Sequence, residues 1–226
     1  MTSARPWLLV LDTATSSVVV AAGTLDGVLI GSTSFPAEHR HGQRLLPAVD
    51  QLARKHALAR TDLAAVIVGT GPGAFTGLRV GLATAKTIAH ELGRPIVGVS
   101  TGEALLAAID APAAATLLLP AGPHDRVEVR AGESPRLLAG SEPDSSADGA
   151  LVAVDLDGRA SDPALAAGRR ALERLAGALL RLGAARLADG ATDDVARLVP
   201  EYVTLPRGVN QPLDPDGAMA WSSDRR

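Results

Sequence analysis

The densest glycine segment of the chain is Gly69-Thr-Gly-Pro-Gly-Ala-Phe-Thr-Gly77, between an apolar run and a helical pattern. Such a turn can leave backbone N–H groups free at a helix N-terminus, where phosphate binds well. A Walker A loop is excluded, because its G-x-x-x-x-G-K-[ST] spacing does not occur. The dinucleotide fingerprint fits Gly69, Gly71 and Ala74 by letter, but antiparallel strands are expected before it and no acidic residue ends the next strand. Glycines that allow a tight turn explain the segment at least as well as anion binding.

A second motif, Gly98-Val-Ser-Thr-Gly102, fits G-x-S-x-G and lies at an expected strand-to-helix turn, as a nucleophilic serine would. A catalytic triad also needs a histidine downstream, and only His124 follows Ser100. No His-Gly-Gly-Gly loop is present to form an oxyanion hole. We therefore interpret Ser100 as the N-cap of the helix that follows it.

Asp12 is the best candidate for a polar site, because it ends the first apolar run and precedes Thr13, Ala14, Thr15 and Ser16. A carboxylate beside several hydroxyl groups could hold a magnesium ion and a nucleotide phosphate. The Cβ of Ala14 argues against close approach of a phosphate, for which glycine is usual. The five histidines show no H-E-x-x-H or H-x-x-x-H spacing, so no metal site is expected.

The elements that must position these residues are clearest in the first half of the chain. Aliphatic runs at 8–11, 18–22 and 28–32 predict three antiparallel strands, and Asp26-Gly27 is a hairpin signal. Helices are predicted at 43–56, 76–92 and 101–109, alternating with strands at 65–68 and 96–99. This order is that of a ribonuclease H-like lobe, and it favours a mixed sheet with helices on both faces.

The second half has weaker patterns, with strands predicted at 116–119, 126–130 and 151–154 and a mobile loop at 133–149. One helix is strongly indicated: Asp162 can cap it, Pro163 suits its first turn and Gly183 can end it. We expect a ribonuclease H-like lobe at 1–110, a degenerate second lobe at 111–205 and a tail at 206–226.

The residues of the helix expected at 76–92 suggest a surface for packing against another helix rather than a ligand-binding pocket. Gly77 and Gly81 lie four residues apart beside Ala85, and apolar residues continue around the axis. A helix that is small or apolar on most sides is buried on most sides. The sheet covers one face, and the pattern alone leaves open whether the preceding helix or another chain covers the other.

Composition and charge exclude several classes of protein. The 226 residues include five aromatic ones, no Cys and a formal net charge of −3. A strongly basic nucleic-acid binder and a disulfide scaffold are therefore excluded. So few rings offer little base stacking, so direct RNA binding is not expected. No run approaches the ~20 apolar residues of a membrane span, and we expect a cytoplasmic protein with no membrane role.

Four segments carry a resemblance to a known family. They are Gly71 to Lys86, Leu11-Asp12-Thr13, Gln43-Arg-Leu-Leu-Pro47 and Pro95 to Ser100. Over roughly residues 7–108 the chain resembles the bacterial TsaB family of tRNA threonylcarbamoyladenosine biosynthesis, also called the YeaZ or glycoprotease-like family. Pro200-Glu-Tyr202 resembles the family's late Pro-x-Tyr, whereas the Asp-Ala-Arg segment usual in the family is replaced around Ala121 to Arg130.

The resemblance implies a two-lobed actin-like ATPase (ASKHA) fold, each lobe related to ribonuclease H. It implies a non-catalytic partner of the threonylcarbamoyl transferase TsaD, working with the small ATPase TsaE, and a homodimer through the same helices. The machinery attaches a threonylcarbamoyl group to the adenosine beside the anticodon. ATP and magnesium would be used by the partner subunits, this chain would need no cofactor of its own, and tRNA would contact it only indirectly.

The site residues follow from the resemblance and from the motifs together. The first two helices would bind the partner through Leu45, Leu46, Val49, Leu52, Gly73, Phe75, Thr76, Gly77, Leu78, Arg79, Gly81, Leu82, Ala85 and Ile88. A vestigial nucleotide site would comprise Asp12, Thr13, Thr15, Gly71 and Gly73.

No catalytic residue is expected, because Glu103, Ala104 and Leu105 stand where the transferase has paired metal-binding histidines, and because no Gly-Gly pair is present. On this scaffold hypothesis, Gly81→Arg should abolish partner binding and leave the fold intact. The alternative hypothesis is a nucleotide-binding or glycopeptidase-like hydrolase that uses Asp12 or Ser100.

Overall fold

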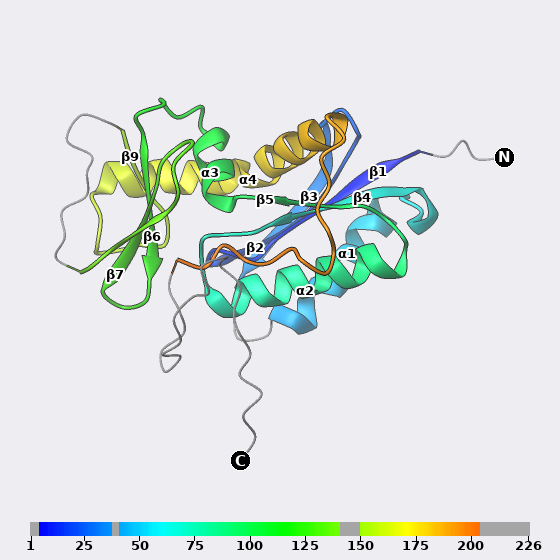
Figure 1. Ribbon diagram of the computed structural model, residues 1–226, viewed down its shortest axis with the longest axis horizontal. Helices are drawn as coiled ribbons and strands as arrows, with labels where there is room; N and C mark the ends of the chain where they lie inside the picture. The colour runs from blue at the N-terminus through cyan, green and yellow to red at the C-terminus, as the bar shows by residue number, and fades with distance from the viewer. Residues whose placement is uncertain (1–4, 38–40, 141–149, 204–226) are drawn as a thin grey trace, which may run out of the picture.

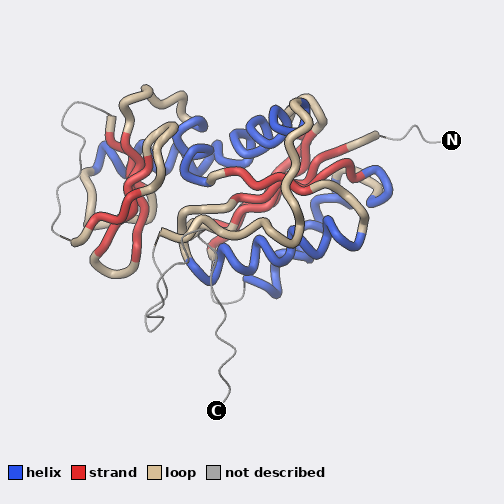
Figure 2. Tube along the Cα trace, viewed as in Figure 1, coloured by secondary structure: helices blue, strands red, loops and turns tan. Residues whose placement is uncertain are grey.

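The computed structural model describes residues 5–37, 41–140 and 150–203, which form two mixed β-sheets with helices around them (Figures 1 and 2). In the first sheet β1 is antiparallel to β2 and parallel to β4. Its strands follow the order β3-β2-β1-β4-β5, with β1 at Trp7–Asp12, β2 at Ser17–Gly23, β3 at Leu29–Pro36, β4 at Leu63–Gly69 and β5 at Ile96–Val99. The predicted α/β class, and the predicted order of strands and helices along the first lobe, are confirmed.

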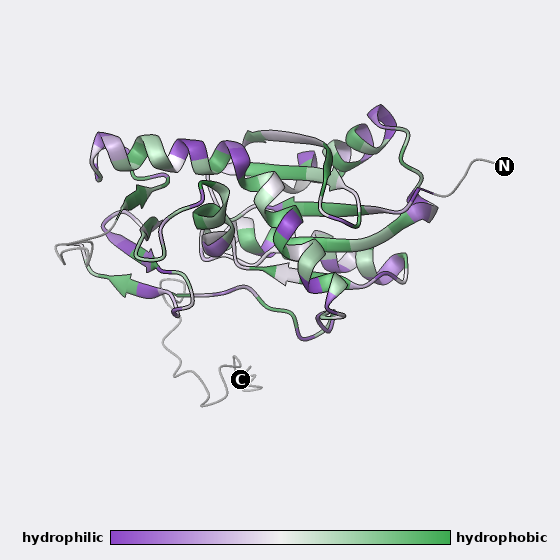
Figure 3. Cartoon of the chain, turned by 90° about the horizontal axis from the view of Figure 1, so that it is seen from above, coloured by the Kyte–Doolittle hydropathy of each residue, from purple (hydrophilic) through white to green (hydrophobic). Residues whose placement is uncertain are grey.

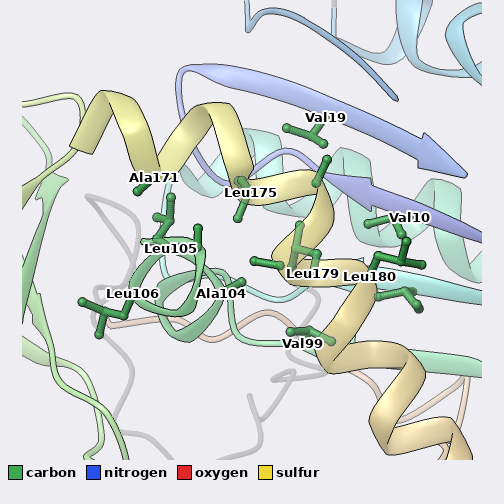
Figure 4. Packing of buried hydrophobic residues seen from close by; sticks show 14 of the residues in the cluster. Val10, Val19, Val99, Ala104, Leu105, Leu106, Ala171, Leu175, Leu179 and Leu180 are labelled. Atoms are coloured by element: carbon green, nitrogen blue, oxygen red, sulfur yellow. The ribbon is translucent and has the colours of Figure 1, made fainter. Parts of the chain in front are cut away.

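Helices cover both faces of the first sheet. Helices α1 (His41–Lys55) and α2 (Phe75–Glu91) pack on one face, and α3 (Thr101–Ala108) and α4 (Asp162–Ala188) lie on the other (Figure 1). Side chains alternate along β1, so Leu9 faces α1 and α2 while Val10 joins the cluster around α4 that Figure 4 shows. Most of the first sheet is hydrophobic, and the helices alternate between hydrophilic and hydrophobic residues (Figure 3). A short 3-10 helix, Arg60–Asp62, precedes β4.

The second sheet repeats the topology of the first with one strand fewer. Here β6 is antiparallel to β7 and parallel to β9, as β1 is to β2 and β4. The order is β8-β7-β6-β9, with β6 at Thr116–Ala121, β7 at Asp125–Val129, β8 at Arg136–Leu138 and β9 at Leu151–Ala153. Strand β8 lies where the sequence predicted only a loop, because three residues are too few to show an alternating pattern.

Helix α4 joins the two sheets, since it contacts β9 at one end and β1, β2, β4 and β5 further along (Figure 1). Two details of its prediction are wrong. Its N-cap is Ser161, so Asp162 belongs to the first turn, and Gly183 lies inside the helix. A Cβ at Gly183 would lie 2.6 Å from Ile67 Cδ1, so this glycine lets α4 approach β4 closely. Gly190, at φ +75°, follows the end of the helix.

After α4 the chain returns across the first lobe as a segment that we call the C-terminal strap, residues 189–203 (Figure 1). Asp193 pairs with Ile96 at the edge of β5 and accepts a hydrogen bond from Gly98 N at 2.8 Å. Lys86 Nζ donates to the carbonyl groups of Ala196 and Leu198. Glu201 N donates to Thr70 O at 2.8 Å, so the strap reaches the glycine segment. The predicted tail at 206–226 lies outside the described residues.

The described part of the chain holds no helix with the length and apolar composition that crossing a bilayer requires. The division of the chain at residue 110 stays a prediction. The two sheets separate near that residue, but α4 returns from the second sheet to the first.

Candidate functional site

Asp12 lies at the end of β1 and is fully buried. Its Oδ2 accepts a hydrogen bond from Thr101 Oγ1 at 2.6 Å, and its Oδ1 accepts one from Ala14 N at 3.0 Å. Burial raises the pKa of Asp12 to about 6, although both hydrogen bonds lower it. A Cβ at Gly69 would overlap this carboxylate, so β4 passes directly over it. The carboxylate is enclosed by its own chain and has no open side for a magnesium ion.

The loop after Asp12 and the glycine segment pack directly on each other. Thr13 Oγ1 donates to Gly77 O at 2.7 Å, and Ala74 N donates to Ala14 O at 2.7 Å. A Cβ at Gly73 would overlap the carbonyl of Ala14. These glycines therefore serve close packing between two loops, and their contacts fill the space that a phosphate at Asp12 would need.

The five residues expected to form a vestigial nucleotide site thus lie close together. Their polar groups, however, bond to other residues of the same chain. Thr15 Oγ1 donates to Ser17 O at 3.1 Å, and Gly71 O accepts from Thr101 N at 2.7 Å. Within the described ranges, no three His, Asp or Glu side chains gather as a metal site would require. The donor set does not fit a bound magnesium ion.

Ser100 is the N-cap of α3, as predicted, and accepts a hydrogen bond from Glu103 N at 3.4 Å. Its Oγ also lies 3.3 Å from Glu201 Oε2 and 3.2 Å from Gly71 O. His124, by contrast, lies between β6 and β7 of the second sheet. The partners of Ser100 are a carboxylate and backbone groups, which do not activate a nucleophile as an imidazole would.

A cleft of about 640 Å³ is lined by the glycine segment, by the end of the C-terminal strap and by residues of β6 and β7. On its wall the Phe75 and Tyr202 ring centroids are 5.2 Å apart. The Arg79 guanidinium lies 4.1 Å from the Phe75 centroid, and Arg79 Nε donates to Tyr202 Oη at 3.1 Å. Burial also raises the pKa of Glu201 in this wall, against its hydrogen bond from Ser100. The Gly-Pro-Gly-Ala-Phe-Thr-Gly-Leu-Arg segment and the distant Pro-Glu-Tyr segment therefore meet, which sequence reasoning missed.

A second concavity, of about 810 Å³, lies between α1 and α2, and we call it the α1–α2 groove. Leu46 is 53% exposed and Leu92 39% exposed, and Val49 and Ile88 are half-buried beside them. Charged residues stand among these apolar side chains: Asp50, Arg54, Arg60 and Glu91. The groove combines an exposed apolar strip with charges of both signs.

The predicted partner face needs correction, because much of it is internal. A Cβ at Gly81 would collide with Thr13 Oγ1 and one at Gly77 with the carbonyl of Thr13, so both glycines face their own chain. The other buried members of the predicted set are Leu45, Leu52, Leu78, Leu82 and Ala85. Those with exposed or half-buried positions are Leu46, Val49, Gly73, Phe75, Thr76, Arg79 and Ile88. Leu92, which the sequence reasoning omitted, belongs with the exposed set.

The same geometry overturns the expected outcome for Gly81→Arg. An arginine there would overlap Thr13 at its first side-chain carbon, and both Gly81 and Thr13 are buried. The substitution would disrupt the packing of α2 on the loop after β1, so it cannot separate partner binding from folding.

Comparisons with known proteins are consistent with this architecture. A family model described as TsaD: tRNA N6-adenosine threonylcarbamoyltransferase matches residues 35–154, more than half of the chain. The tRNA threonylcarbamoyladenosine biosynthesis protein TsaB of Bacillus subtilis is 35% identical over 100 residues, 44% of this chain and 43% of that protein. An uncharacterized protein of Mycobacterium tuberculosis is 42% identical over 101 residues, 43% of this chain and 47% of the relative. The chain thus spans less than half the length of these curated relatives.

Similarity in three dimensions extends further along the chain. YeaZ from Pseudomonas aeruginosa superimposes with a TM-score of 0.68 at 26% identity, covering 87% of this chain and 99% of that one. The shared fold therefore includes the second sheet.

Proposed function

This chain belongs to the family of the tRNA N6-adenosine threonylcarbamoyltransferases as a TsaB/YeaZ-type protein, and from that premise we propose that it works in tRNA threonylcarbamoyladenosine biosynthesis. The proposed role is that of a non-catalytic subunit which binds a TsaD-type transferase and holds it in an active conformation. Any ATP and magnesium would be used by partner subunits, including a TsaE-type ATPase, and tRNA would be held mainly by those partners.

The observation that supports the non-catalytic role is that the chain's own residues occupy the space around Asp12 in the first lobe. Asp12 is buried under Gly69 and bonded to Thr101, and the two loops beside it contact each other directly. A hydrolase using Asp12 would need that carboxylate open to a metal ion or a water molecule. A hydrolase using Ser100 would need a base that takes the hydroxyl proton, and His124, the histidine downstream of Ser100, lies between β6 and β7 of the second sheet.

The α1–α2 groove is the surface that best supports partner binding. The groove has exposed leucines with charged side chains around them. This arrangement is typical of a protein interface, in which a polar rim encloses an apolar centre. We propose that the transferase occupies the groove in the complex, and that a second copy of the chain can occupy it when the transferase is absent.

The test is Leu46→Asp, with Leu25→Asp as its matched control. Both leucines are about half exposed, at 53% and 49%, but Leu25 lies in the β2–β3 turn away from the groove. Placing a carboxylate in an apolar interface should weaken binding of the organism's own TsaD-type transferase by about 10-fold or more. Titration calorimetry would measure the affinity, and circular dichroism would verify that both variants remain folded.

Leu25→Asp should bind like the wild type, and Leu46→Asp should reduce threonylcarbamoyladenosine formation by the reconstituted subunits. Equal affinities for Leu46→Asp and wild type would contradict the groove as the binding surface. ATP or ester hydrolysis by the isolated chain, abolished by Asp12→Ala or Ser100→Ala, would contradict the non-catalytic role instead.

A further inference from the structure

A contact across the two lobes joins the loops that follow β1 and β9. The carboxylate of Asp155, just beyond β9, accepts hydrogen bonds from both donors of Ser16, which lies 139 residues earlier in the chain. Ser16 N donates to Oδ2 at 2.7 Å, and the Ser16 hydroxyl donates to Oδ1. Each carboxylate oxygen thus receives its own hydrogen bond, the two-point arrangement in which proteins bind oxyanions.

Two other backbone donors near Ser16 bond within the loop itself. Ala14 N donates to Asp12, and Ser17 N donates to Thr15 Oγ1. Ser16 is exposed, and its N–H and O–H point away from that bonded core to meet Asp155. A backbone amide and a hydroxyl presented together by a tight loop form a concavity suited to an anion.

Asp155 holds an unfavourable backbone conformation in making this contact. Its φ is +57°, in the left-handed region that non-glycine residues seldom adopt. A residue retains such a conformation where the surrounding contacts outweigh its cost. The hydrogen bonds to Ser16 are contacts of that kind, and they place a negative charge on the two donors of Ser16.

We propose that the loop Asp12–Ser17 is an anion cradle that the chain fills with its own carboxylate, Asp155. The internal anion fastens the second lobe to the first and keeps a free phosphate group from the loop. The inference does not depend on the proposed partner or on tRNA, because it concerns only contacts within this chain.

The test compares Asp155→Gly with Asp157→Gly as the matched control. Glycine removes the carboxylate at 155 and relieves the left-handed backbone, whereas the exposed Asp157 has the same side chain two residues away. If the contact fastens the lobes, Asp155→Gly should lower Tm by roughly 3–6 °C despite the relieved backbone. Asp157→Gly should change Tm by less than about 2 °C.

The second readout is stabilisation by inorganic phosphate, measured against chloride at matched ionic strength. Emptying the cradle should let phosphate raise the Tm of Asp155→Gly by several degrees more than that of the wild type or of Asp157→Gly. Adding Ser16→Ala should remove this gain, because the hydroxyl donor is then lost. A phosphate effect equal in all variants, or one that survives Ser16→Ala, would overturn the proposal, as would an unchanged Tm in Asp155→Gly.

Discussion

At the scale of single residues, Asp12 is a carboxylate that the chain places at the end of a strand and then buries. Asp12 follows the apolar run of β1 in sequence, so its backbone position is settled by the strand. Its burial is settled by Gly69 and Thr101, which come from β4 and α3 and are distant in sequence. From its type and position, Asp12 was a candidate to hold a magnesium ion and a nucleotide phosphate, whereas its neighbours make it an internal hydrogen-bond acceptor.

The raised pKa of Asp12 predicts a specific dependence of stability on pH. Its pKa is about 6 in the folded chain against an ordinary value of 3.8, so the folded state keeps this proton in a range where the unfolded state has released it. The resulting stability is fully present below pH 3.8 and is lost as the pH rises through about 6. The total change is at most about 3 kcal/mol.

Urea unfolding of wild type and Asp12→Asn between pH 4 and pH 7 measures this contribution, since asparagine does not titrate there. The free energy of unfolding of the wild type should fall relative to that of Asp12→Asn as the pH rises. Asp26→Asn, at an exposed position in the β2–β3 turn, is the control and should keep the wild-type slope. Parallel pH curves for wild type and Asp12→Asn would refute the assignment.

At the scale of elements, glycines set how closely the long helices approach their neighbours. In α2 the pair Gly77 and Gly81 lies against Thr13, and in α4 Gly183 lies against Ile67. The sequence showed small residues four apart and predicted that this helix is buried against its neighbours. It could not tell which partner approaches, because a helix pattern shows only that a face is small and apolar.

Two glycines of α4 give a matched pair for testing this role. A Cβ at Gly183 would lie 2.6 Å from Ile67 Cδ1, whereas a Cβ at Gly177 would meet only Arg181 NH1, at 3.5 Å. Gly177→Ala should therefore stabilise the chain by roughly 0.5–1 kcal/mol, because alanine favours a helix interior. Gly183→Ala should destabilise it by about 1–3 kcal/mol, because Ile67 is fully buried and has to move.

Chemical denaturation of the two variants at neutral pH is sufficient to measure these opposite signs. Stabilisation by Gly183→Ala would show that α4 can shift on the sheet without cost, contrary to close packing at this point.

At the scale of the whole molecule, α4 packs against both sheets and holds them together. Its buried residues Ala171, Leu175 and Leu179 pack in one core with Val10 of the first sheet (Figure 4). The same core contains Val127 of the second sheet. The C-terminal strap then returns over the first lobe to the interlobe cleft. Neither lobe can separate without exposing one side of this shared core.

We therefore predict that both lobes unfold together in a single transition. Trp7, buried in the first lobe, reports on that lobe by fluorescence in a Trp221→Phe background. The chain has no Cys, so a fluorophore on Glu133→Cys reports on the second lobe. The two probes should give coincident midpoints in urea. Midpoints that differ beyond experimental error would show that the lobes unfold independently.

The sequence by itself determined the first lobe, because its strands and helices repeat apolar residues at the periods that each element buries. It also determined that Ser100 caps α3 and that the chain resembles the TsaB family, since both depend on residues close together in the chain. Strand β8, the interior position of Gly183 and the side of α2 that remains free were decided only by tertiary structure. The junctions of Arg79 with Tyr202 and of Ser16 with Asp155 join residues more than 120 positions apart. A contact of that kind depends on where α4 and the strap cross the first sheet. The periodicity of a short sequence segment does not show where a distant segment crosses.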